Sequence, residues 1–212
     1  MTRVLVTRPA GQAAPLAEAL SRAGFEPVVV PLIEIVPIDD GPIDVDAYDW
    51  VIVTSTNGAD QLAARIVGRA RIAAIGHTTA DALRVHGLPV DFVPTRADQE
   101  TLVAEFPRPV GRALFVGAED ARGVIATELP ADVRTVYRTR RVVPGSVPEA
   151  DLAVIASPSA ARALEAVTTA IPAVSIGPIT TDAARAARLD IAAEAKTQDL
   201  PGIVAAVREA AG

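Results

Sequence analysis

The sequence predicts an α/β fold built on parallel sheets and divided between two bodies, and three observations support this prediction. Apolar runs rich in valine and isoleucine alternate with helical patterns along nearly the whole chain, as strands covered on both faces require. A stretch bearing glycine and threonine at residues 74–83 returns at residues 175–184. Two long extended runs, residues 27–39 and 133–145, interrupt the alternation. We therefore expect right-handed parallel β-α-β connections within each body.

The first elements follow from local patterns. Residues 3–7 are rich in β-branched residues, and residues 12–24 carry helical apolar spacing closed by a glycine. In the run 27–39, Pro31 and Pro37 would disrupt a central strand, so part of it is expected at a sheet edge or in a connection.

The remaining elements alternate in the same manner. Strands are expected within residues 50–56, 71–76, 90–94, 112–117, 133–145, 151–156, 173–176 and 190–195, and helices within residues 59–67, 79–87, 98–106, 119–129, 158–167, 178–189 and 199–211.

The internal repeat aligns Gly76 with Gly177 and Thr79 with Thr180, and it continues to Asp98 and Asp199. We favour duplication as its origin, and chance similarity between alanine-rich helices is the alternative. Each copy passes from a strand through glycine into a helix whose threonine hydroxyls are expected to cap its start. Helix N-termini at the carboxyl ends of parallel strands favour anions, so two anion-binding rims are expected.

Composition excludes several classes of function. The formal net charge is −6, which disfavours broad nucleic-acid binding, and 19 of the 20 basic side chains are arginines. The chain has no cysteine and only two histidines, so no metal site is expected. No signal sequence and no membrane-spanning run is recognised, which predicts a cytoplasmic protein without membrane contact. With no obvious exposed apolar stripe, we expect a monomer.

The order of several short segments resembles the uroporphyrinogen-III synthase family. These segments are VLVTRP with Gln12, PLIEI from Pro31, VTSTNGA from Val53, AIGHTTADAL, TVYRT from Thr135, ASPSA from Ala156 and SIGPITTDAA. The match covers nearly the whole chain. Thr181, where alanine is common, and Arg188, where glycine usually ends the helix, depart from the family pattern.

The resemblance implies two flavodoxin-like parallel-sheet domains joined by a two-stranded β linker. The terminal domain would comprise residues 1–34 and 144–212, the middle domain residues 39–136, and the linker strands residues 35–38 and 137–143. It also implies cyclisation of hydroxymethylbilane, a linear tetrapyrrole with eight carboxylates, to uroporphyrinogen III with inversion of the last pyrrole ring. This reaction needs no cofactor, in agreement with the absence of G-x-G-x-x-G and P-loop motifs.

The candidate site residues are polar groups and glycines that follow the strands. The expected substrate-binding set is Arg8, Ser55, Asn57, Gly58, Gly76, Thr79, Arg122, Ser157, Ser159, Gly177 and Thr180. For most of them helix capping is the alternative role, and for Arg8 and Arg122 it is exposure to solvent. From the resemblance, Tyr137 is expected to assist departure of the substrate hydroxyl as a positional acid, and packing within a strand is the alternative.

A different class of function remains open at this point. A two-lobed, non-catalytic protein that binds a small anion would present the same fold and the same rims. The polycarboxylate substrate is the expected partner, and a transient contact with the enzyme that makes the bilane is a further expectation.

Overall fold

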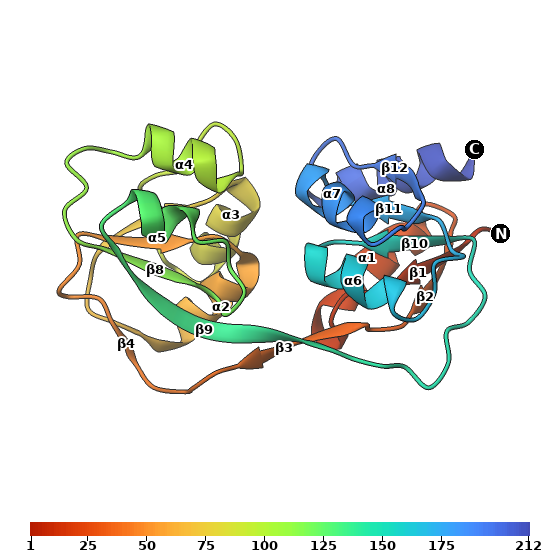
Figure 1. Cartoon of the computed structure of the whole chain (residues 1–212), viewed down its shortest axis with the longest axis horizontal. Coiled ribbons are helices and arrows are strands. Elements are labelled where there is room, and N and C mark those ends of the chain that lie inside the picture. Colours follow the sequence, from red (N-terminus) through yellow and green to blue (C-terminus); the bar gives the residue numbers. More distant parts are fainter. The chain divides into compact units, whose positions relative to one another are not determined.

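The computed structural model describes residues 1–212, which divide into two compact units (Figure 1). Unit 1 comprises residues 1–34 and 140–212, and unit 2 comprises residues 35–139. The chain therefore leaves unit 1 and returns to it. None of its helices has the length and apolar character needed to cross a membrane.

Unit 1 is a five-stranded parallel sheet with helices on both faces. Its elements are β1 (Arg3–Val6), α1 (Ala10–Arg22), β2 (Glu26–Val29), β10 (Leu152–Ile155), α6 (Pro158–Glu165), β11 (Ala173–Ser175), α7 (Pro178–Ala186), β12 (Ile191–Glu194) and α8 (Leu200–Ala211). The strand order is β12-β11-β10-β1-β2, and every pairing is parallel. Numbered within the unit, this is the flavodoxin-like order 2-1-3-4-5.

Alternation along the strands divides the core of unit 1 into two layers. Val4 and Val6 face α1 and α8, whereas Leu5, between them, faces α6 and α7. All three side chains are fully buried. The continuous apolar runs of the sequence thus mark strands that are covered on both sides.

Unit 2 contains a second five-stranded sheet and a small two-stranded one. Its elements are β3 (Ile33–Pro37), β4 (Ile43–Asp44), β5 (Trp50–Val53), α2 (Thr56–Arg65), β6 (Ile66–Val67), β7 (Arg71–Ala74), α3 (His77–Val85), α4 (Gln99–Glu105), β8 (Ala113–Ala118), α5 (Val124–Glu128) and β9 (Ala131–Arg141). The first two residues of β3 and the last two of β9 belong to unit 1. The main order is β3-β9-β8-β5-β7, and β4 pairs with β6. One face of the sheet packs on α2 and α3, and the other on α4 and α5.

The expected strand at residues 90–94 is reduced to an isolated bridge between Phe92 and Ala73. With this bridge included, the parallel part of the sheet reads β9-β8-β5-β7-Phe92. This order matches that of unit 1 when β8 is placed on β1 and β9 on β2. β5 then corresponds to β10, and β7 corresponds to β11.

The aligned residues occupy equivalent positions in the two units. Asp98 and Asp199 are the N-caps of α4 and α8, and each accepts a backbone N–H three residues ahead at 2.7 Å. Gly76 and Gly177 are the N-caps of α3 and α7. This agreement of position and capping chemistry supports duplication over chance similarity.

The two long runs form the neighbouring strands β3 and β9, and the expected domain and linker boundaries stay a prediction. β3 and β9 pair antiparallel, since Ile38 N–H donates to the Val136 carbonyl and Val142 N–H donates to the Leu32 carbonyl. Residues 35–38 and 137–139 belong to unit 2, and residues 140–143 belong to unit 1.

Candidate functional site

The candidate residues lie where the strands end and the chain turns into helices. In an open α/β sheet, the crevice for a ligand lies at the carboxyl ends of the strands where the strand order reverses. In unit 1 this point lies between β1 and β10, whose following loops carry Arg8 and Ser157. In unit 2 it lies between β8 and β5, and β5 is followed by Ser55 in the loop and by Asn57 in the first turn of α2.

The start of α2 is fixed by Ser55. Its hydroxyl accepts the Gly58 backbone N–H at 3.0 Å, which makes it the N-cap of the helix. A Cβ on Gly58 would lie 3.2 Å from the Ser55 Oγ and 3.3 Å from Val53 Cγ1. Gly58 therefore lets the helix start approach the end of β5, a packing role that its place in the sequence alone does not reveal.

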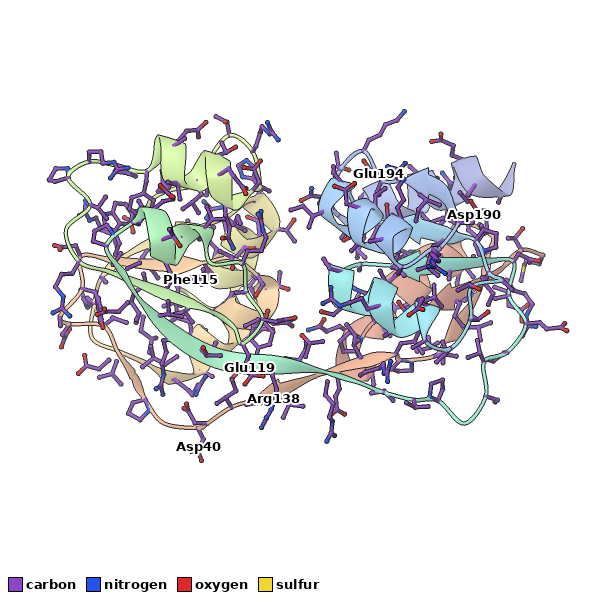
Figure 2. All side chains as sticks on the ribbon, viewed as in Figure 1. Asp40, Phe115, Glu119, Arg138, Asp190 and Glu194 are labelled. Atoms are coloured by element: carbon purple, nitrogen blue, oxygen red, sulfur yellow. The ribbon has the colours of Figure 1, made fainter.

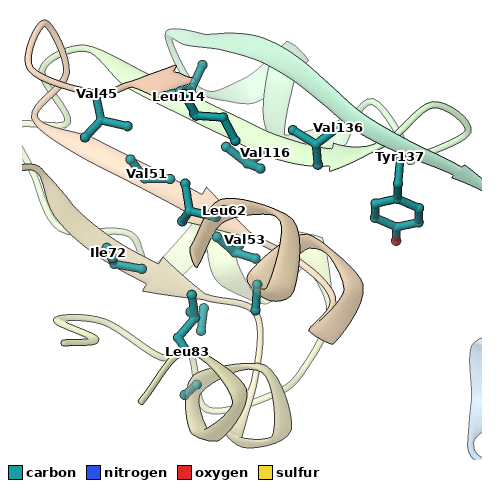
Figure 3. Packing of buried hydrophobic residues seen from close by; sticks show 14 residues of the cluster. Val45, Val51, Val53, Leu62, Ile72, Leu83, Leu114, Val116, Val136 and Tyr137 are labelled. Carbon is teal, nitrogen blue, oxygen red and sulfur yellow. The ribbon is translucent and has the colours of Figure 1, made fainter. Parts of the chain in front are cut away.

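Tyr137 reaches this helix start from the neighbouring strand β9. The Tyr137 hydroxyl lies 2.9 Å from the Ser55 Oγ, and its side chain is only 6% exposed. Figure 3 shows Tyr137 at one end of the buried cluster, next to Val136. The ring thus packs in the core as the alternative interpretation expected, while the hydroxyl contacts the start of α2. A role of Tyr137 as a positional acid stays a prediction.

A β-bulge explains why two consecutive residues of β9 face the same cluster. Gly117 pairs with Thr135 and Ala118 pairs with Tyr137, so Val136 is the extra residue. Side chains normally alternate between the two faces of a strand, and one inserted residue reverses the alternation beyond it. The bulge therefore turns Tyr137 towards Ser55.

The environment of Tyr137 keeps its phenol protonated. Burial raises its pKa above the ordinary 10.0, and hydrogen bonds from Ser55 and Asn57 only partly oppose that effect. At neutral pH the group is a hydroxyl that can donate a hydrogen bond or a proton, and it is not a base.

Arg8 in unit 1 is a partly buried cation that makes no hydrogen bond or ion pair. Burial lowers its pKa, which records the cost of removing a guanidinium from water without compensation. A carboxylate bound at this position would supply the missing partner, and Arg can bind it through two parallel hydrogen bonds.

The other polar residues near the switch point of unit 1 have structural partners. Ser157 is the N-cap of α6 and accepts the Ala160 N–H at 3.1 Å, and Ser159 lies 3.4 Å from the Arg162 guanidinium. The Thr7 hydroxyl is fully buried and donates to the Val154 carbonyl at 2.7 Å. These hydroxyls are thus already paired within unit 1.

The expectation that threonines cap α3 and α7 is wrong. The N-caps are Gly76 and Gly177, and neither makes a side-chain cap. Thr79 and Thr180 lie inside the helices with only 5% and 4% exposure, because these positions face the sheet. The Thr180 N–H donates to the Gly177 carbonyl at 3.0 Å, so this N–H already has a partner within its own helix.

The glycines themselves are needed because another loop approaches closely. A Cβ on Gly76 would lie 2.7 Å from the Ala97 Cβ, and one on Gly177 would lie 3.0 Å from Gln198 Nε2. Both glycines have extended backbones, so the requirement is space and not an unusual φ.

Arg122 is engaged by another side chain of unit 2. Its guanidinium binds both oxygens of Glu100, at 2.6 and 3.1 Å, in a partly exposed pair. A substrate carboxylate would have to displace Glu100, so Arg122 is less available than Arg8. The residues from 119 to 129, expected to be helical, form helix only in α5 (Val124–Glu128).

Sequence reasoning missed the β-bulge and a polar cluster around Asp39 that lies beside it. A bulge depends on the register between two paired strands, so no local sequence pattern within one strand predicts it. It also missed that Thr181 and Ser175 are buried and hydrogen-bonded to one another. The departure of Thr181 from the family pattern was the one available signal.

Comparison with known proteins decides the family. The family described as "Uroporphyrinogen-III synthase HemD" matches residues 14–205. The chain belongs to this family. Since the match covers far more than half of the 212 residues, it includes both units.

Individual members of the uroporphyrinogen-III synthase family show the same relation. The chain is 29% identical over 173 residues to the uroporphyrinogen-III synthase of Synechococcus elongatus, covering 69% of this chain and 63% of that protein. It is 32% identical over 162 residues to the porphyrin biosynthesis protein HemD of Ruminiclostridium josui, covering 69% of this chain and 31% of that protein. The aligned part thus spans less than two thirds of either relative.

Two solved structures share the fold. The uroporphyrinogen-III synthetase of Helicobacter pylori superposes with a TM-score of 0.69 at 16% identity, covering 98% of this chain and 99% of that chain. A mutant uroporphyrinogen III synthase of Thermus thermophilus gives 0.63 at 17% identity, covering 100% of this chain and 99% of that chain. The α/β architecture in two parts is therefore that of known uroporphyrinogen-III synthases.

Proposed function

We propose that this protein cyclises hydroxymethylbilane to uroporphyrinogen III with inversion of the last pyrrole ring, within the tetrapyrrole and heme pathway. The observation that carries the proposal is the family match over residues 14–205. The Tyr137 hydroxyl, which contacts the N-cap of α2, and the unpaired Arg8, which follows β1, are compatible with it.

The proposed chemistry divides the work between substrate and protein. The terminal hydroxymethyl carbon loses its hydroxyl as water and leaves an electrophilic azafulvene, which the substituted carbon of the last pyrrole attacks. The spiro intermediate then fragments and recloses with that ring inverted. Direct closure to the type I isomer needs no enzyme, so the protein's main task is to control substrate conformation.

Particular residues would serve this task in different ways. Tyr137 would donate a hydrogen bond or a proton to the departing hydroxyl, since its raised pKa keeps it protonated. Arg8 would bind a substrate carboxylate. Ser55, Asn57, Gly58, Ser157 and Ser159 would shape the strand-end loops that contact substrate, whereas Gly76, Thr79, Gly177, Thr180 and Arg122 would act mainly through packing or an existing ion pair.

Incubation with freshly prepared hydroxymethylbilane tests the proposal. Product isomers are separated after oxidation and compared with a protein-free control, in which type I forms spontaneously. Type III product in excess is the expected result. Type I alone, together with tight binding of a tetrapyrrole polycarboxylate, would instead support the non-catalytic anion-binding protein.

The oligomeric state, the location and the partner enzyme of the protein stay predictions. A monomer is expected, and sedimentation equilibrium would test it. A cytoplasmic location and a transient contact with the enzyme that produces the bilane are also expected, and the contact can be tested by asking whether that enzyme raises the yield of type III product.

A further inference from the structure

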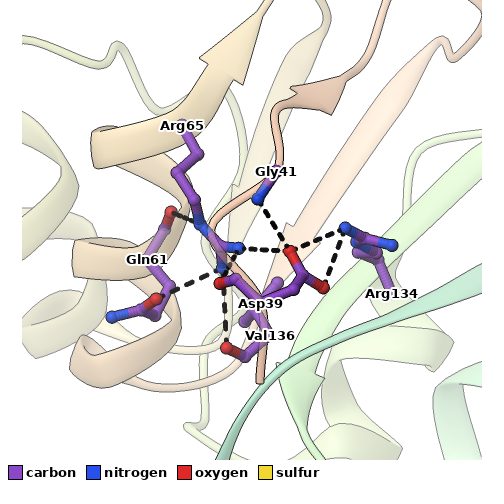
Figure 4. Close-up of polar contacts among 6 residues, drawn as sticks. All are labelled: Asp39, Gly41, Gln61, Arg65, Arg134 and Val136. Atoms are coloured by element: carbon purple, nitrogen blue, oxygen red, sulfur yellow. Dashed lines mark hydrogen bonds and ion pairs between the residues drawn. The ribbon is translucent and has the colours of Figure 1, made fainter. Parts of the chain in front are cut away.

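A cluster of charged side chains joins three segments of unit 2 at Asp39 (Figure 4). Asp39 follows β3, and its carboxylate accepts hydrogen bonds from two arginines. Arg65 Nη1 donates to Oδ1 at 2.8 Å, and Arg134 Nη2 lies 3.0 Å from each of the two oxygens. The Gly41 N–H donates to it at 3.1 Å. Arg65 comes from the end of α2 and Arg134 from β9, so one carboxylate connects the helix, the strand and the chain after β3.

Arg65 is held by several contacts at once. Its Nη1 also donates to the Asp39 carbonyl at 2.6 Å, and its Nε and Nη2 donate to the Gln61 carbonyl at 3.3 Å and the Gln61 Oε1 at 3.2 Å. Its side chain is only 9% exposed. A buried guanidinium with this many partners has one well-defined position, and removing one partner leaves costly unpaired groups.

The cluster lies at the bulge that orients Tyr137. The carbonyl of the extra residue, Val136, accepts the Ile38 N–H at 3.2 Å and lies 3.5 Å from Arg65 Nη2. An extra residue in a bulge is left out of the regular ladder, so its polar groups need other partners. The chain after β3 and the end of α2 supply them here.

Helix α2 is consequently connected to β9 at both of its ends. Ser55 at the N-cap contacts the Tyr137 hydroxyl, and Arg65, the last helical residue, contacts Asp39 and approaches Val136. The helix has 10 residues and is about 15 Å long. Release at one end would let it pivot, which would change the separation of the two hydroxyls at the other end.

We propose that Arg65, together with Asp39, is a positioning residue for Tyr137: it holds the bulge at Val136 and the end of α2 so that the phenol meets Ser55. The effect on catalysis rests on the proposed function, but the effect on the position of the phenol does not. The first experiment therefore measures the phenol directly.

The chain has only two tyrosines, Tyr48 and Tyr137, so ¹³Cζ labelling of tyrosine gives two assignable NMR signals. In Arg65→Gln and in Asp39→Asn, the Tyr137 signal should shift, and its titration should move down towards the ordinary pKa of 10.0 as burial is lost. The Tyr48 signal should stay in place. Asp39→Asn keeps the size of the side chain, so it preserves the test if Arg65→Gln fails to fold.

Asp132→Asn is the matched control, because Asp132 is another carboxylate with an arginine partner and lies in β9, the strand that carries Tyr137. It pairs with Arg112 at 3.2 Å and accepts the Tyr48 hydroxyl at 3.0 Å. This control should move only the Tyr48 signal, whose pKa Asp132 raises through that hydrogen bond. An unmoved Tyr137 signal in both cluster variants, with the control behaving as expected, would overturn the proposal.

Activity provides the second readout. Arg65→Gln should lower kcat about tenfold with little change in KM, and it should have almost no further effect in a Tyr137→Phe background. Equal losses in both backgrounds would overturn the proposal, since Arg65 would then act independently of the phenol. If the wild-type protein forms no type III product, the proposed function fails while the NMR result still decides the positioning role.

Discussion

At the scale of single residues, Tyr137 and Arg8 are the two groups whose surroundings call for a functional explanation. Tyr137→Phe removes only the hydroxyl, and it should lower kcat by about ten- to a hundredfold without abolishing activity, because conformational control remains. In the wild type, activity that depends on the protonated phenol should persist through neutral pH and fall only above pH 10, since burial raises this pKa. Tyr48→Phe is the control, and isomer-resolved kinetics is the measurement. Complete loss of activity in folded Tyr137→Phe would assign the phenol an indispensable role.

Arg8 should show a trade-off between stability and function. Arg8→Met keeps an apolar stem and removes a partly buried charge that has no partner, so the midpoint of thermal unfolding should rise. KM for the bilane should rise as well, because a carboxylate contact is lost. Arg185→Met, which removes an exposed charge of the same unit, should change neither quantity much. An Arg8 variant with lower stability and unchanged KM would identify a structural role instead.

At the scale of elements, the two units provide natural comparisons for one another. The buried hydroxyls of Ser175 and Thr181 lie 2.5 Å apart in unit 1, and Thr181 also donates to Glu194. The repeat places Ala74 and Ala80 at the equivalent positions of unit 2, where they are fully buried. The fold thus accepts either an apolar or a polar pair.

Removing one of these hydroxyls should therefore lower the free energy of unfolding more than removing both. Thr181→Ala strands the Ser175 hydroxyl in the core and should lower the free energy of unfolding by about 1–3 kcal/mol. The double variant Ser175→Ala with Thr181→Ala should recover most of that loss, because no buried group is left unpaired. Denaturant titration of the single and double variants is the measurement. Additive losses would show that the hydroxyls contribute independently.

Glycines with and without neighbours should respond oppositely to a methyl group. Gly76→Ala should destabilise the protein, since the new Cβ would lie 2.7 Å from the Ala97 Cβ. Gly11→Ala, in the first turn of α1, meets nothing within 4 Å and should stabilise it by about 0.4–1 kcal/mol through the unfolded chain. Thermal unfolding of both variants tests the pair. A stabilising Gly76→Ala would mean that the loop at Ala97 yields easily.

The elements also show how far sequence reasoning extends. Strands such as Trp50–Val53, buried at every residue, follow from apolar runs, and Ser55 as an N-cap follows from its place after such a run. The direction of Tyr137 does not, because it depends on a register shift against β8. The expectation that Thr79 caps α3 was wrong for a related reason. A hydroxyl near a helix start is typical of an N-cap, but Gly76 is the N-cap here and Thr79 is buried within the helix.

At the scale of the whole molecule, charge is divided unequally between the units. Unit 1 carries 10 basic and 11 acidic side chains, a net charge of −1, and unit 2 carries 10 basic and 15 acidic side chains, a net charge of −5. A polycarboxylate would thus meet the weaker repulsion in unit 1, where Arg8 is unpaired. Short-range donors are consequently more important for its capture than the overall field.

The division into units also predicts separate unfolding transitions, since the chain crosses between them only within β3 and β9. The single tryptophan, Trp50, is 2% exposed in unit 2 and contacts Phe106 with a ring separation of 5.1 Å, so its fluorescence reports unit 2 alone.

Leu16 is fully buried in unit 1, and Leu16→Ala should lower the free energy of unfolding of that unit by about 2–5 kcal/mol. In urea, the fluorescence transition should stay in place while part of the far-UV circular dichroism change moves to lower concentration. Leu62→Ala in unit 2, also fully buried, should move the fluorescence transition itself. Coincident shifts of both probes in Leu16→Ala would mean that the two units unfold as one cooperative structure.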